Sequence, residues 1–167
     1  MIIKPLSQDS LMDTITLAHK VFVNSAKSEN PPENGLRASL HPEESKDFLE
    51  KRGIRKLQYY VAYDDKIKRV IGVIGQYEEC KDPLDTVWVG WFCVDPSFRG
   101  KNLGEELLTW NMQNAREKGY KIMKLYTSDL PSEQAAQGLY DKLGFEVKEI
   151  KPVEGKGYNL LFRERPL

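Results

Sequence analysis

The sequence predicts an α/β (α+β) fold in which helices flank a mixed, mainly antiparallel central sheet. Two β-prone runs, 57–63 and 69–77, are joined by a short polar turn, which is typical of an antiparallel pair. Residues 87–115 then follow the order strand, glycine-bearing loop and amphipathic helix. No internal repeat, low-complexity tract or linker divides the 167 residues, so we expect a single domain over residues 1–167.

The first third predicts two helices separated by a loop. Residues 1–5 are β-prone, and Ser10 can cap a helix whose apolar residues recur at helical spacing until about Asn24. Residues 24–40 contain few large apolar side chains, two adjacent prolines and a glycine, so they predict a long mobile loop. Two interpretations of that loop stay open, a lid or binding loop and a solvated connection. A second helix is expected over 42–51.

The remaining chain alternates between strand and helix. Gly72 and Gly75, inside the run 69–77, indicate a bulge or the close approach of another segment. The further elements expected are strands at 87–94, 121–127, 145–150 and 158–163, with helices from Leu103 to about Gly119 and from Pro131 to Gly144. The closing glycines suit left-handed helix caps.

Composition excludes several classes of function. The 25 Lys and Arg residues balance 25 Asp and Glu residues, whereas broad nucleic-acid binding depends on a basic excess. Cys80 and Cys93 form no CxxC pattern and the chain has two histidines, so we expect no metal site and no disulfide framework. The N-terminus has no apolar signal-peptide core, and no apolar run approaches membrane-spanning length. We therefore expect a cytoplasmic protein that binds neither nucleic acid nor membrane.

The stretch 87–115 has an arrangement that proteins use to hold a phosphate. Its strand, rich in Val, Trp and Phe, ends at the turn Asp95-Pro96-Ser97, since proline cannot donate to a sheet ladder. A basic loop with two glycines, residues 99–104, then leads into the helix. The unpaired N–H groups and positive dipole end of such a helix start attract anions. The alternative, that the glycines only relieve backbone strain, stays open at this point.

Two segments of the chain resemble the GNAT N-acetyltransferase superfamily. VDPSFRGKNLGEELL is similar to the family's acyl-CoA-binding motif, Q/R-x-x-G-x-G/A after a strand ending V-x-P, with Arg99 first and Gly104 last. Asn102 stands where the family has its middle glycine, and Asn adopts a left-handed backbone more readily than most residues. SEQAAQGLYDKLGF is similar to the family's N-x-x-A-x-x-x-Y-x-x-x-G-F segment, with Tyr140 in register and Glu133 in place of asparagine.

The resemblance covers about residues 57–163 and implies a GNAT-like fold that uses acetyl-CoA as the acetyl donor. It implies that backbone N–H groups at the helix start hold the diphosphate, and that others at the end of the central strand hold the acyl carbonyl. The residues implied to contact acetyl-CoA are Cys93, Val94, Arg99, Gly100, Lys101, Asn102, Leu103, Gly104, Glu133 and Ala136.

The implied reaction is direct attack of a primary amine on the thioester. In this family a tyrosine at the position of Tyr140 protonates the departing thiolate, although helix spacing alone would also suit a core tyrosine. We expect Cys93 to pack as a small hydrophobe rather than act as a nucleophile. Glu78 and Glu79 are candidates for the general base, with two alternatives left open: that they are solvated loop carboxylates, and that a water chain takes the proton.

The acceptor amine stays open, and a small-molecule or peptide amine is the expected partner. The family selects acceptors through segments that correspond to 24–40 and 151–157. Five aromatic residues either line a pocket or fill the faces of the sheet: Tyr59, Tyr60, Tyr77, Trp88 and Trp91. The C-terminal strand around 160–162 either pairs across a homodimer or lies inside the sheet.

The sequence leaves two alternative functions open. One is a catalytically silent acyl-CoA-binding regulatory module, for which the substitutions at Asn102 and Glu133 are the reason. The other is an enzyme that binds a nucleotide phosphate in the same loop, but residues 99–104 lack the G-x-x-x-x-G-K-S/T pattern that such a site needs.

Overall fold

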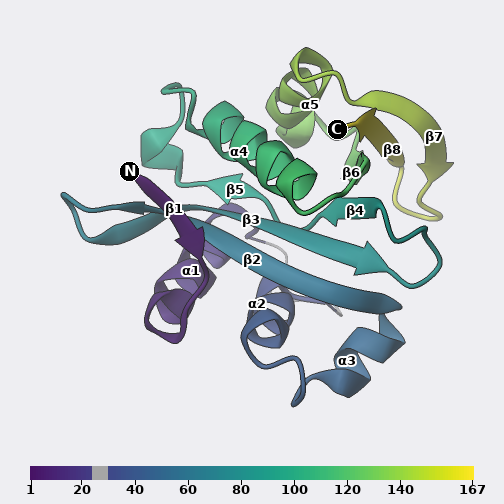
Figure 1. The fold of residues 1–167 in the computed structure, drawn as a ribbon. Coiled ribbons are helices and arrows are strands. Elements are labelled where there is room, and N and C mark those ends of the chain that lie inside the picture. Colours follow the sequence, from purple (N-terminus) through teal and green to yellow (C-terminus); the bar gives the residue numbers. More distant parts are fainter. Residues whose placement is uncertain (24–29) are drawn as a thin grey trace.

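The computed structural model describes residues 1–23 and 30–167, which form a β-sheet with helices on both faces (Figure 1). The helices are α1 (Gln8–Val21), α2 (Pro32–Leu40), α3 (Lys46–Lys51), α4 (Leu103–Glu117) and α5 (Gln134–Lys142). The strands are β1 (Ile2–Pro5), β2 (Ile54–Asp64), β3 (Arg69–Glu79), β4 (Thr86–Val89), β5 (Cys93–Val94), β6 (Ile122–Ser128), β7 (Glu146–Pro152) and β8 (Asn159–Pro166). Two 3-10 turns, η2 (Pro96–Phe98) and η3 (Pro131–Glu133), precede α4 and α5.

The eight strands form one sheet in the order β1-β2-β3-β4-β6-β8-β7, with β5 paired to β3. Every neighbouring pair is antiparallel except β4 and β6, which run parallel. The parallel pair requires a crossover, and α4 provides it. The predicted mixed, mainly antiparallel sheet flanked by helices is confirmed.

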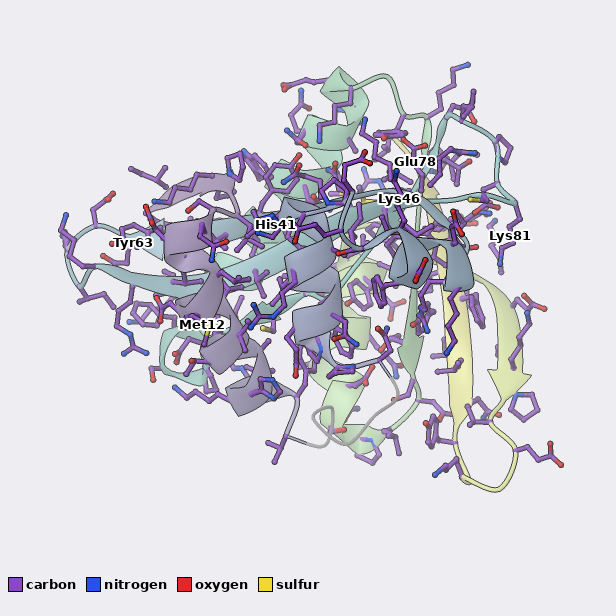
Figure 2. All side chains as sticks on the ribbon, turned by 90° about the horizontal axis from the view of Figure 1, so that it is seen from below. Met12, His41, Lys46, Tyr63, Glu78 and Lys81 are labelled. Atoms are coloured by element: carbon purple, nitrogen blue, oxygen red, sulfur yellow. The ribbon has the colours of Figure 1, made fainter. Side chains whose placement is uncertain are left out.

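Two cores hold the layers together. Helices α4 and α5 lie over one face of the sheet, and α1, α2 and α3 lie over the other (Figure 1). The α4 face buries Leu107 and Leu108 completely, and the α1 face buries Leu11 and Leu36. Each helix is thus fixed by burial of one apolar stripe. Strands β7 and β8 have no helix over them on the α1 side (Figure 2).

The N-terminal third differs most from expectation. The N-cap of α1 is Ser7, and Ser10 lies in the first turn, where its Oγ accepts the Ser7 N–H at 3.0 Å. The long loop expected over 24–40 is wrong for its second part, because α2 begins directly after Pro31 with Pro32 at its first position. Residues 24–29 lie outside the described residues. The expected helix over 42–51 is shorter, since α3 begins only at Lys46.

The strand expected over 87–94 is two strands separated by a β-bulge. Val89 pairs with Gln76 and Cys93 pairs with Val73, so three residues between them face two residues on β3. The insertion turns the chain, and β5 therefore leaves the direction of β4.

The C-terminal half follows the sequence prediction closely. Helix α4 ends two residues before Gly119, and α5 ends two residues before Gly144, and both glycines have positive φ angles. Strand β8 lies between β6 and β7, so the interior position expected for it as one alternative is confirmed. Among the described helices, none combines the length and hydropathy that crossing a bilayer requires.

Candidate functional site

The centre of the sheet opens where β4 and β6 separate. Their parallel pairing ends at Trp88 and Lys124. Beyond this point β5 pairs only with β3, and residues 125–128 of β6 pair only with β8. We call this region the splay. The strand edges that face it carry backbone groups without a sheet partner, which is where a ligand can pair.

Only one of the two backbone groups expected to hold an acyl carbonyl faces the splay. The N–H of Asp95 donates to the Ile71 carbonyl at 2.8 Å. Because antiparallel residues alternate between bonded and non-bonded pairs, Cys93 is bonded to Val73, and the Val94 N–H points away from β3. The Cys93 N–H is therefore occupied within the sheet, whereas the Val94 N–H is not bonded to β3 and stays a candidate donor.

The Cys93 thiol is unsuited to nucleophilic chemistry. The residue is buried and packs in the core under α1. Burial raises the pKa of the thiol to about 12, so the reactive thiolate is scarce at neutral pH.

The loop before α4 has the backbone shape of an anion site. Gly100 has a φ of 73° and Asn102 has a φ of 59°, with Lys101 between them outside the left-handed region. Such alternation turns successive N–H groups toward one point, forming a nest for an anion. The Asn102 side chain makes no cap hydrogen bond, so the first N–H groups of α4 stay open. Arg99 and Lys101 are exposed beside them, whereas Leu103 is buried in the core.

Gly104 lies where the loop, β5 and α5 meet. A Cβ on Gly104 would lie 3.7 Å from Leu139 of α5 and 3.9 Å from Val94 of β5. Ala136, one turn before Leu139, is partly buried against the same core. The structure therefore brings together the two predicted segments, 99–104 and 133–140, which are separate in the sequence.

Tyr140 follows Leu139 on α5 and is buried in the same core. It is 7% exposed, and its ring lies edge-on to Phe145 with the ring centroids 6.0 Å apart. Its hydroxyl makes no hydrogen bond to any described residue. Burial, assisted by the charge of Glu133, raises the pKa of Tyr140 well above its ordinary value. The phenol therefore stays protonated and has a proton to donate.

Glu133 holds the end of β6. Its carboxylate accepts the hydroxyl of Thr127 and, at 3.0 Å, the N–H of Ser128. Gln137 adds a bond to the Ser128 carbonyl at 2.6 Å. The expectation that Glu133 contacts a cofactor is not supported by this geometry, because one carboxylate oxygen already has two donors. Thr127, Ser128 and Gln137 carry no motif, so sequence reasoning missed them.

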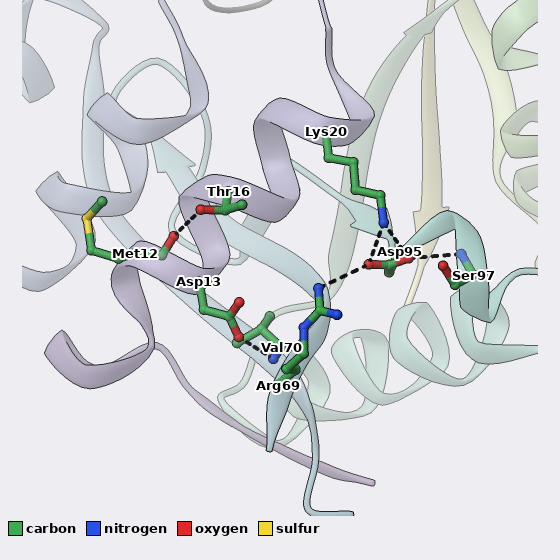
Figure 3. Close-up of polar contacts among 8 residues, drawn as sticks. All are labelled: Met12, Asp13, Thr16, Lys20, Arg69, Val70, Asp95 and Ser97. Atoms are coloured by element: carbon green, nitrogen blue, oxygen red, sulfur yellow. Dashed lines mark hydrogen bonds and ion pairs between the residues drawn. The ribbon is translucent and has the colours of Figure 1, made fainter. Parts of the chain in front are cut away.

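Asp95 anchors the anion-binding loop to α1 (Figure 3). Both of its oxygens accept Lys20 Nζ at 3.0 Å, and one accepts the Ser97 N–H at 2.9 Å. Arg69 lies 3.9 Å from the carboxylate. Burial alone would raise the pKa of Asp95, but the bonds from Ser97 and Lys20 outweigh it and lower the pKa. No pattern in the sequence indicates this anchor, because Lys20 lies 75 positions away from Asp95.

Glu78 and Glu79 lie far from the splay. Val94 faces Gly72 on β3, and Glu78 is six residues further along the same strand, about 20 Å away. Glu78 accepts Arg55 at 2.7 Å and the Tyr120 hydroxyl at 2.5 Å, and Glu79 pairs with Lys81 at 2.7 Å. These bonds lower the pKa of Glu78 although burial opposes them. Figure 2 shows Glu78 at the end of the sheet opposite the β7–β8 turn, so the base assignment is corrected.

The five aromatic residues lie in three places, and Tyr59 and Trp91 belong to the core under α1 and α2. Trp88 stacks on Tyr77 at 6.0 Å and meets Phe162 edge-on, so both fill the uncovered face of the sheet. There Trp88 and Phe162 border an open pocket of about 240 Å³ lined also by Lys124 and Lys151. Tyr60 instead packs under α4. No cluster of metal-ligating side chains occurs within residues 1–23 and 30–167.

Comparison with known proteins identifies the family. The family model for the acetyltransferase (GNAT) domain matches residues 55–147, more than half of the chain. An uncharacterized N-acetyltransferase of Methanocaldococcus jannaschii is 35% identical over 57 residues, which cover 34% of this chain and 24% of that protein. The aligned segment thus spans about a quarter of this relative.

Solved structures share the fold at low identity. An N-acetyltransferase from Staphylococcus aureus Mu50 has a TM-score of 0.72 at 17% identity, covering 99% of this chain and 97% of that one. A ribosomal-protein-alanine N-acetyltransferase from Brucella melitensis has a TM-score of 0.70 at 17% identity over 100% of both chains.

Proposed function

This chain belongs to the GNAT acetyltransferase family, and from that premise we propose that it moves an acetyl group from acetyl-CoA to a primary amine. The observation that carries the proposal is the junction at Gly104, where the anion nest, the Val94 edge and the helix of Tyr140 meet. A donor with a diphosphate at one end and a thioester at the other needs these three parts in this order. We also propose that residues 1–167 act as one N-acetyltransferase domain in the cytoplasm.

The proposed chemistry uses three groups of the chain. The N–H groups of residues 100–104 hold the diphosphate, with Arg99 and Lys101 adding positive charge. The Val94 N–H donates to the acyl oxygen as negative charge develops there when the amine attacks the carbonyl carbon. The carbon–sulfur bond then breaks, and Tyr140 donates its proton to the departing thiolate. The amine's own proton leaves through water, since neither Glu78 nor Glu79 is within reach.

A catalytically silent acyl-CoA-binding module remains the second candidate. Its support is Glu133, which is bound to Thr127 and Ser128 instead of being free for the donor. Asn102 weighs against it, because this residue adopts the left-handed backbone that the family's glycine would adopt. A silent module still needs the nest to bind acyl-CoA, but it does not need a protonated tyrosine at the position of Tyr140.

The test is release of free thiol from acetyl-CoA in the presence of a panel of amines. The panel holds a free amino acid, a polyamine, a lysine side-chain analogue and a peptide with N-terminal alanine. The peptide is included because one structural neighbour is named a ribosomal-protein-alanine N-acetyltransferase. We expect thiol release that depends on one amine class. Saturable acetyl-CoA binding in calorimetry, with no thiol release from any class, would support the silent module instead.

A further inference from the structure

The bulge between β4 and β5 is supported by a side chain from β2. The N–H of Trp91, within the bulge, donates to the hydroxyl of Tyr59 at 3.3 Å. No other acceptor among the described residues takes this N–H. Because β3 lies between β2 and the bulge, the Tyr59 ring has to cross a whole strand to reach it.

Three glycines open the path for that ring. Tyr59 pairs with Gly75 on β3, where a Cβ would lie 2.6 Å from the ring. A Cβ on Gly90 would lie 3.0 Å from the Tyr59 hydroxyl, and a Cβ on Gly35 of α2 would lie 3.2 Å from it. The ring is therefore enclosed by β3, the bulge and α2 together. Tyr59 is 3% exposed, so the slot excludes water.

Tyr59 also ties α2 to the sheet through its backbone. Its N–H donates to Ser39 Oγ of α2 at 2.9 Å, and its carbonyl accepts the N–H of Leu6 at 2.9 Å. One residue thus connects the helix on the α1 side of the sheet with the strand edge that faces the splay.

Resting on the proposed acetyl transfer, we propose that Tyr59 is a positioning residue that fixes the bulge and so aims the Val94 N–H at the acyl carbonyl. The position of a bulge decides which later residues face β3, because a shift by one residue reverses every following N–H. Without the Tyr59 hydroxyl, the half-buried Trp91 N–H loses its partner, and the insertion is left with the Gly90 N–H bond to Gly75 and the packing of the Trp91 ring on Phe22. Displacing a catalytic donor by about 1 Å can cost as much as 100-fold in rate.

The test compares Tyr59→Phe with Tyr77→Phe. Both variants remove one hydroxyl from a ring on the α1 side of the sheet, but Tyr77 stacks on Trp88 and does not touch the bulge. For Tyr59→Phe we expect kcat to fall about tenfold, with the KM for acetyl-CoA nearly unchanged, because the Val94 bond strengthens in the transition state. The amide hydrogen of Trp91 should exchange slowly in the unmodified protein and rapidly in Tyr59→Phe only.

Two results would overturn the inference: a kcat for Tyr59→Phe equal to that of Tyr77→Phe, or a Trp91 amide that exchanges rapidly in the unmodified protein. Gly75→Ala offers a second route, since its Cβ displaces the ring while the hydroxyl is retained, and it should lower kcat in the same way. If the unmodified protein acetylates no amine, the proposed function fails, and the amide exchange alone decides whether Tyr59 fixes the bulge.

Discussion

The two sides of the splay present different kinds of chemical group. The donor side, formed by β5, residues 99–104 and the facing helix α5, presents backbone N–H groups whose directions follow from φ angles and strand pairing. The other side, where we expect the acceptor, is formed by α1, α2 and the uncovered sheet face, and it presents side chains from segments far apart in the sequence. A site made of backbone groups can be recognised in the sequence from glycines and short motifs. A site made of side chains from distant segments cannot be recognised in this way. The comparison therefore explains why the donor can be proposed and the acceptor class cannot.

Removing the Tyr140 hydroxyl should have the largest effect on the donor side. For Tyr140→Phe we expect kcat to fall by about one to two orders of magnitude, because the thiolate then departs without a proton. Acetyl-CoA affinity, measured by calorimetry, should be retained, since the ring still packs against Phe145. Tyr63→Phe, at the end of β2 and away from the splay, is the control. Equal turnover in both variants would remove Tyr140 from the mechanism.

Breaking the Lys20–Asp95 ion pair should show that α1 holds the loop before α4 in place. Lys20→Met leaves the buried Asp95 carboxylate with Ser97 and the more distant Arg69. Because the Lys20 side chain is 47% exposed, we expect a loss of only about 1 kcal/mol in the free energy of unfolding. Acetyl-CoA should also bind more weakly, as the anchored loop loosens.

The control for that variant is Lys46→Met, which breaks an exposed pair with Glu43 and should change neither quantity. Chemical denaturation and calorimetry on both variants measure the two effects. Unfolding free energy lost without any change in acetyl-CoA affinity would mean that α1 does not hold the loop.

The left-handed backbone at Asn102 gives a smaller, local test. Asn102→Ala should weaken acetyl-CoA binding about fivefold, since alanine at positive φ costs roughly 1 kcal/mol or more. Asn102→Gly should bind as well as the unmodified protein, because glycine adopts this φ freely. Calorimetric titration distinguishes the three proteins. Equal weakening by alanine and glycine would point to the asparagine side chain rather than the backbone.

Acid should weaken the same anchor in a defined pH window. The pKa of Asp95 is lowered in the folded protein, so its contribution to stability is complete above its unfolded pKa of about 3.9 and is lost as pH falls through the lower folded value. Asp95→Asn should therefore show less loss of unfolding free energy between neutral pH and pH values near 3 than the unmodified protein. Parallel denaturation curves at both pH values test this, and an identical loss in both proteins would contradict it.

Glu78→Gln should have the smallest effect on turnover. Its carboxylate lies about six residues along β3 from the strand pair that borders the splay, so kcat should change by no more than about twofold. Loss of the charge opposite Arg55 should lower the unfolding free energy slightly. Steady-state kinetics at saturating amine provide the measurement. A tenfold fall in kcat would restore Glu78 as the base.

What the sequence could predict follows the same division. The left-handed Asn102 and the glycines that end α4 and α5 are local backbone effects, and each was predicted at its position. The sheet class followed from the strand order alone. Helix α2 was missed because Pro32 and Gly35 resemble loop residues, although proline suits the first turn and glycine is needed beside Tyr59.

The features that the sequence predictions missed or misplaced depend on contacts between distant segments. In the split of residues 87–94 the Trp91 N–H bonds to Tyr59 of β2, and the loop anchor involves Lys20 of α1. Glu78 and Glu79 were assigned from their place after a strand, but the register of β3 puts them at the wrong end of it. Pairing and register are properties of the folded sheet, so no single segment reveals them.

The sheet is joined across its middle by three registered residue pairs between β4 and β6, compared with seven between β6 and β8. A ladder this short has few hydrogen bonds to break, so we expect the sheet to deform between β4 and β6 more easily than between β6 and β8. In the proposed function, such a deformation would change the opening of the splay, and with it the width available to an acyl chain.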